Sequence, residues 1–84
     1  MDSQESRIAV ISIIIEDTAS VAPLNALLHE YGSYIIGRMG IPYRERGIHI
    51  VSLAMDAPVG VTSALTGRIG RLPGVNARTA FAGK

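Results

Sequence analysis

The sequence predicts one small α+β domain in which strands and helices follow the order β-α-β-β-α-β. Three observations support this order: a short run rich in β-branched residues, two segments with apolar residues at helical spacing, and two apolar runs joined by a polar turn. The chain has 84 residues, which suits a single domain over residues 1–84, with residues 1–6 as a flexible N-terminal tail.

The first strand and the first helix are expected near the start of the chain. Residues 7–15 consist mainly of isoleucine and valine and end at an acidic pair, which indicates a short strand. A helix follows, because Pro23 is tolerated only in a first helical turn and Gly32 suits the left-handed position that ends a helix. This helix carries one apolar stripe, formed by Val21, Leu24, Leu28 and Tyr31.

The rest of the chain predicts a hairpin, a second helix and a last strand. Residues 34–41 and 48–55 are apolar runs that flank a polar turn, the pattern of a β-hairpin. A helix is expected to open at residues 56–58, and its apolar stripe is Val61, Leu65, Ile69 and Leu72. Residues 75–81 alternate as a strand with one solvated face does. Three glycines in the second helix indicate a weak helix or close approach by another backbone: Gly60, Gly67 and Gly70.

This order of elements corresponds to the ferredoxin-like plan. Right-handed crossovers place both helices on one face of a four-stranded antiparallel sheet, in which the first and third strands are central. The second strand is expected at an edge, because Gly37 and Pro42 weaken a central strand more than an edge strand.

Both central strands are apolar on both faces, although two helices can cover only one face. The uncovered face would then expose an aliphatic patch of the kind found at interfaces. We expect this face to pack on the same face of another copy, in a homodimer or homotetramer; the alternative is that the chain ends cover it. The sequence does not decide which face meets the helices. The candidate interface residues are Ile8, Val10, Ile14, Ile50, Val51 and Leu53.

Composition argues against several classes of function. Lys+Arg number 8 and Asp+Glu 7, so the net charge of +1 gives no general attraction to nucleic acid or membranes. Without cysteine there is no disulfide scaffold, thiolate chemistry or Cys-ligated metal. His29 and His49 are too few for a metal site unless subunits share them. No nucleophile or phosphate-loop motif occurs, so we expect neither an enzyme nor a bound cofactor.

A cytoplasmic location is expected from two further features. No apolar run approaches the about 20 residues that a membrane-spanning helix needs. The N-terminal residues Met1 to Glu5 are polar and acidic, whereas a secretory signal starts basic and continues apolar.

The hairpin turn carries the densest polar cluster. If extended, Arg44 and Arg46 would point the same way and grip a carboxylate or phosphate, with Arg38 joining them from the preceding strand. The simpler interpretation is a solvated hairpin tip with a local Arg–Glu pair. As a hypothesis, a small effector or a partner protein binds at the set Arg38, Tyr43, Arg44, Glu45, Arg46 and His49.

Four segments together resemble a known family: residues 7–17, 27–32, 34–47 and 70–75, of which the hairpin segment is the most specific. They resemble the iron-only hydrogenase system regulators, an ACT-like family similar to the C-terminal regulatory domain of the nickel-responsive repressor. The resemblance covers about residues 7–81. It implies a small cytoplasmic homo-oligomeric module that senses a small effector or binds a partner protein.

Two other functions stay open at this point. One is a nucleic-acid-binding transcriptional regulator that uses Arg38, Arg44, Arg46, Arg68 and Arg71, which the near-neutral charge disfavours. The other is a small oligomeric enzyme with a site between subunits, because a fold alone does not decide function.

Overall fold

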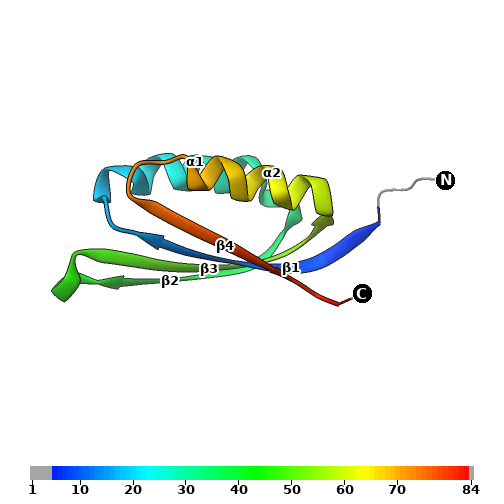
Figure 1. Ribbon diagram of the computed structural model, residues 1–84, viewed down its shortest axis with the longest axis horizontal. Coiled ribbons are helices and arrows are strands. Elements are labelled where there is room, and N and C mark those ends of the chain that lie inside the picture. The colour runs from blue at the N-terminus through cyan, green and yellow to red at the C-terminus, as the bar shows by residue number, and fades with distance from the viewer. Residues whose placement is uncertain (1–4, 84) are drawn as a thin grey trace.

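The computed structural model describes residues 5–83 (Figure 1). The main elements are β1 (Ser6–Ile15), α1 (Val21–Glu30), β2 (Ile35–Tyr43), β3 (Ile48–Pro58), α2 (Val59–Gly70) and β4 (Val75–Phe81). Short 3₁₀ turns occupy Thr18–Ser20, Gly32–Tyr34 and Arg44–Arg46. The predicted order β-α-β-β-α-β is confirmed. Of the tail expected over residues 1–6, residues 1–4 lie outside the described residues, and Ser6 already belongs to β1.

The four strands form one antiparallel sheet in the order β2-β3-β1-β4. Strands β1 and β3 are therefore central and β2 and β4 are edges, as predicted. Both helices lie on the same side of the sheet (Figure 1). This arrangement is the ferredoxin-like fold, and it leaves the other side of the sheet without a covering layer within the described residues.

The core lies between the helices and one face of the sheet. Alternate residues of β1 point toward the helices and are buried, and the same holds for alternate residues of β3. The helical stripes meet them with Leu24 and Leu28 from α1 and Leu65 and Ile69 from α2. The buried strand residues are Ala9, Ile11, Ile13, Ile15, Val51, Leu53, Met55 and Ala57.

The assignment of Val51 and Leu53 to an interface is wrong. Val51 pairs with Ile13 and Leu53 pairs with Ile11 across the two central strands, and paired residues share a face of the sheet. Both side chains therefore lie under the helices, where Leu53 has no exposed surface and Val51 is 6% exposed.

The second helix begins later than the sequence predicts. Residues 56–58 do not open it, because they extend β3 as far as Pro58. The reason is tertiary: β1 reaches back to Ser6, which pairs with Pro58, and Ala57 pairs with Arg7. Pairing along the full length of β1 outweighs the local tendency of Asp56 to cap a helix.

The turn before β4 packs tightly against the end of β1. The Gly74 carbonyl accepts a hydrogen bond of 2.7 Å from the Glu16 amide, and the Pro73 carbonyl accepts one of 2.6 Å from the buried Ser20 hydroxyl. Gly74 has a φ of 67°, and a Cβ added there would lie 2.7 Å from the Cβ of Asp17. Only glycine meets both conditions.

The glycines of α2 are not sites of close approach within this chain. A Cβ at Gly60, Gly67 or Gly70 would meet nothing within 4 Å. Of the two interpretations of these glycines, the structure supports a helix weakened by its own residues.

Replacing Gly67 with alanine is expected to stabilise the fold, because the position lies inside α2 and has open space around it. The free energy of unfolding should rise by about 0.5–1 kcal/mol in urea denaturation. The Gly74→Ala variant is the matched opposite and should lose stability. If both variants changed the free energy of unfolding in the same direction and by the same amount, the structural difference between the two positions would be contradicted.

A second pair of substitutions tests the buried hydroxyls. Thr62 is fully buried, and its Oγ1 has no hydrogen-bond partner among the described residues. Removing this hydroxyl in Thr62→Val should raise the free energy of unfolding by about 1 kcal/mol. Ser20→Ala should lower it by about 1 kcal/mol, because it leaves the Pro73 carbonyl without its donor. Thermal and urea unfolding of both variants measure the contrast, and a loss of stability in Thr62→Val would refute it.

Candidate functional site

The face of the sheet opposite the helices carries exposed aliphatic side chains. From the predicted interface, Ile8, Val10 and Ile14 of β1 and Ile50 of β3 lie on this open face and are 39–45% exposed. Side chains of this type are normally buried, and a large exposed group of them is uncommon on the surface of a monomeric protein.

The open face extends onto β2, which the sequence did not reveal. Met39 pairs with Ser52 and Ile41 pairs with Ile50, so both side chains share the open face, where they are 61% and 49% exposed. Their alternation is visible in the sequence. The sequence does not show which face of the sheet these side chains lie on, because a register irregularity between Ile35 and Gly37 resets the alternation of β2.

The polar residues of the open face lie at its centre and margins. Ser12 and Ser52 pair at the middle of the two central strands. Asp56 lies beside Ile8 near one end of β3, and Asn76 and Arg78 lie on the edge strand β4. The apolar patch therefore spans β2, β3 and β1. The described terminal residues leave this patch accessible, while residues 1–4 and 84, on which the alternative of covering chain ends also rests, lie outside the described residues.

The hairpin tip is exposed, as the simpler interpretation expects, but the arginines are neither aligned nor paired with Glu45. Arg44 and Arg46 lie in a 3₁₀ turn that ends at Gly47 with a φ of 66°, so the extended geometry that would align them is absent. Glu45 accepts a 2.9 Å hydrogen bond from the Tyr43 hydroxyl. Among residues 5–83, no ion pair joins Glu45 to either arginine.

A hollow forms where β2 faces α1. The helix-side residues of β2 are Arg38, Gly40 and Pro42, which pair with Leu53, Val51 and His49. Gly40 and Pro42 fill little space beneath the helix, and a cavity of about 210 Å³ remains. Its apolar lining comprises Ile15, Val21, Leu24, Ile41, Pro42 and Val51, and its polar lining is Asn25, Arg38 and His49.

The charge of Arg38 is not neutralised in this hollow. Its Nη2 donates a 3.0 Å hydrogen bond to Oδ1 of Asn25, a neutral amide. No carboxylate of the described residues lies within ion-pair distance of Arg38. The guanidinium is thus held in place while most of its five N–H donors stay available.

A second hollow of about 460 Å³ lies next to the first, on the hairpin side of His49. Thr18, Pro42, Tyr43, Arg44 and His49 contribute to its lining. Of the predicted site residues, the structure therefore groups Arg38 with His49 and groups Tyr43 and Arg44 with His49. Glu45 contacts Tyr43, and Arg46 lines neither hollow.

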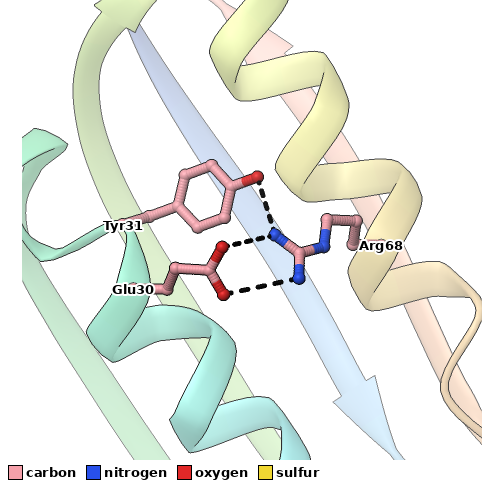
Figure 2. Close-up of polar contacts among 3 residues, drawn as sticks. All are labelled: Glu30, Tyr31 and Arg68. Atoms are coloured by element: carbon pink, nitrogen blue, oxygen red, sulfur yellow. Dashed lines mark hydrogen bonds and ion pairs between the residues drawn. The ribbon is translucent and has the colours of Figure 1, made fainter.

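The helix layer contains a polar cluster that the sequence did not reveal (Figure 2). Arg68 of α2 donates from Nη1 to Glu30 Oε2 at 2.8 Å and to the Tyr31 hydroxyl at 3.1 Å, and from Nη2 to Glu30 Oε1 at 3.4 Å. The hydrogen bond from Arg68 lowers the pKa of Glu30, and the same bond raises the pKa of Arg68. No local pattern connects Glu30 with Arg68, because they are brought together only by packing of α1 on α2.

This cluster ties the helices together and borders a hollow of about 460 Å³ that includes Arg71. Because Glu30 already pairs with Arg68, one of the five arginines considered for nucleic acid is neutralised within the chain. Across residues 5–83, no group of three His, Cys, Asp or Glu side chains is placed to hold a metal ion. None of the helices described there is long and apolar enough to cross a membrane.

Comparisons with known proteins agree with this fold. The TM1266-like family model, described as "Iron-only hydrogenase system regulator, putative", matches residues 7–79. The uncharacterized protein TM1266 from Thermotoga maritima superposes with a TM-score of 0.88 at 28% identity, covering 92% of this chain and 98% of that one. No curated protein sequence matches the chain.

Two more distant structures share the fold alone. The C-terminal domain of the MgtC protein from Mycobacterium tuberculosis has a TM-score of 0.71 at 12% identity, with 98% of this chain and 93% of that chain covered. A formyltetrahydrofolate deformylase from Pseudomonas putida KT2440 has a TM-score of 0.64 at 13% identity, with 87% of this chain but only 28% of the enzyme covered.

The Glu30–Arg68 pair makes a testable prediction about pH. Because the folded-state pKa of Glu30 is lowered, the pair contributes stability above the unfolded pKa of this carboxyl and loses it as pH falls through the folded pKa. The stability difference between wild type and Glu30→Gln should therefore shrink on acidification. In NMR titrations, Arg68→Gln should raise the pKa of Glu30, and the control Arg71→Gln should leave it unchanged. An unaltered Glu30 pKa in Arg68→Gln would contradict the assignment.

Proposed function

The chain belongs to the TM1266-like family of iron-only hydrogenase system regulators, and from this membership we propose that it works as a small self-associating regulatory module. In this proposal the module is cytoplasmic, forms a homodimer or homotetramer, and responds to a small effector or a partner protein. The family is described as a regulator, and the proposal assigns no catalytic step to the chain.

The observation that carries the proposal is the aliphatic open face. Six large apolar side chains from three strands are 39–61% exposed there: Ile8, Val10, Ile14, Met39, Ile41 and Ile50. Burying the remaining surface of each contributes about 1 kcal/mol, which exceeds what a typical exposed ion pair provides. In a dimer with a two-fold axis, the open face of one subunit packs on the same face of the other subunit. Such a closed assembly therefore needs only one kind of surface.

The effector or partner is proposed to bind at the hairpin side of the domain. Two hollows meet there at His49, and Arg38 and Arg44 supply positive charge without an ion-pair partner among the described residues. Tyr43, Glu45 and Arg46 complete the polar surface of the hairpin. His49 and Arg38 lie on the helix side of the sheet, opposite the open face. Tyr43 pairs with Ile48 and lies on the side of the open face, so the proposed site reaches around the end of the hairpin.

Self-association is tested with two valines of equal exposure. Val10 on the open face and Val59 at the start of α2 are each 40% exposed. Wild type at micromolar concentration should sediment as a dimer or tetramer. Val10→Glu should shift it to monomer, because the charge would be buried in the apolar contact. Val59→Glu should leave the assembly intact.

The result that would overturn the assembly is a monomeric wild type in sedimentation velocity at micromolar concentration. Equal dissociation by Val10→Glu and Val59→Glu would also overturn it, because the open face would then have no special role. Circular dichroism of each variant confirms that the fold is retained before the assembly state is compared.

A further inference from the structure

We propose that the hollow between α1 and the β2–β3 hairpin binds a small organic carboxylate with a short apolar chain. Arg38 and His49 hold the carboxylate, and the aliphatic wall of the hollow holds the chain. The inference rests on the proposed regulatory function and names the class of effector for it.

The size of the hollow selects a small ligand. Its volume of about 210 Å³ equals the liquid volume of about seven water molecules. The space exists because β2 turns Gly40 and Pro42 toward α1, where a strand of the core would present large side chains. A ligand with a few carbon atoms replaces the apolar contacts that these two residues do not supply.

The walls of the hollow select an apolar chain. Ile15, Leu24 and Val51 belong to the buried core and form the floor of the hollow, where they are only 1–6% exposed. The apolar surface that stays accessible belongs to lining residues that are not buried, among them Val21 and Pro42. A compact inorganic anion such as phosphate would leave this aliphatic wall uncovered and would lose its own hydration beside it. A carboxylate with a hydrocarbon tail satisfies both parts of the lining.

The charged groups select a carboxylate. Arg38 is fixed by the 3.0 Å hydrogen bond to Asn25 and keeps further N–H donors for a planar, two-oxygen acceptor. His49 lies on the neighbouring strand, opposite Pro42, and lines the same hollow. Asn25 Oδ1 contributes by positioning the guanidinium rather than by contacting the ligand.

The lining also discriminates against an amino acid. The described residues around the hollow include neither aspartate nor glutamate, and the side-chain oxygen of Asn25 already accepts from Arg38. The ammonium group of an amino acid would find no carboxylate partner in this lining. The preferred ligand is therefore a carboxylate that has no ammonium group.

The test uses isovalerate as the probe, titrated into the full-length protein and followed by ¹H–¹⁵N NMR. Three matched compounds accompany it: isovaleramide, which has the same shape without charge, valine, which adds an ammonium group to the same carbon skeleton, and phosphate. Isovalerate should shift the amides of Asn25, Gly40 and His49. It should bind more tightly than each of the three matched compounds.

Variants separate specific capture from weak surface binding. Arg38→Gln should weaken isovalerate binding by about tenfold or more, because a charge-assisted hydrogen bond is lost. Asn25→Ala should weaken it less, because the guanidinium is only released from its position. Arg71→Gln alters an exposed arginine outside the hollow and should leave the affinity unchanged.

The inference is overturned if isovalerate does not bind, if any of the three matched compounds binds as tightly, or if Arg38→Gln and Arg71→Gln behave alike. Sedimentation of the same samples distinguishes this failure from failure of the proposed function. A wild type that self-associates but does not bind isovalerate refutes the carboxylate site and leaves the proposed assembly standing.

Discussion

The register between β1 and β3 is the constraint on which the rest of the molecule depends. Ser6 to Ile15 pair without a break with Pro58 to His49, so every second residue of both strands is committed to the same layer. One set of aliphatic side chains meets the helices and becomes the core. A slip of one residue would exchange that set for the other.

The same alternation separates two roles on the edge strand β2. Arg38 and Gly40 point toward α1, where they shape the small hollow, while Met39 and Ile41 point away and widen the open face. The small hollow and the open face are thus lined by neighbouring residues of the same strand. This proximity arises from the pleat of a single strand and requires no additional element.

The fold was predictable because its signals are local and periodic, whereas the sites depend on tertiary pairing. The stripes of both helices and the limits of β4 follow from the sequence, and the structure confirms them. The sequence does not show which face of the sheet the helices cover, since both faces of β1 are aliphatic. This explains the wrong placement of Val51 and Leu53. The Glu30–Arg68 pair and the 3₁₀ turn at Arg44 likewise depend on packing and turn geometry.

The irregularity of the edge strand β2 has a consequence for how copies of this chain can join. A long, regular strand edge invites endless sheet extension, the route by which proteins form fibres. In β2, Pro42 lacks an amide hydrogen and the irregularity between Ile35 and Gly37 interrupts the ladder. The irregular β2 is therefore a poor template for a further strand, which protects this edge of the sheet against amyloid-like extension.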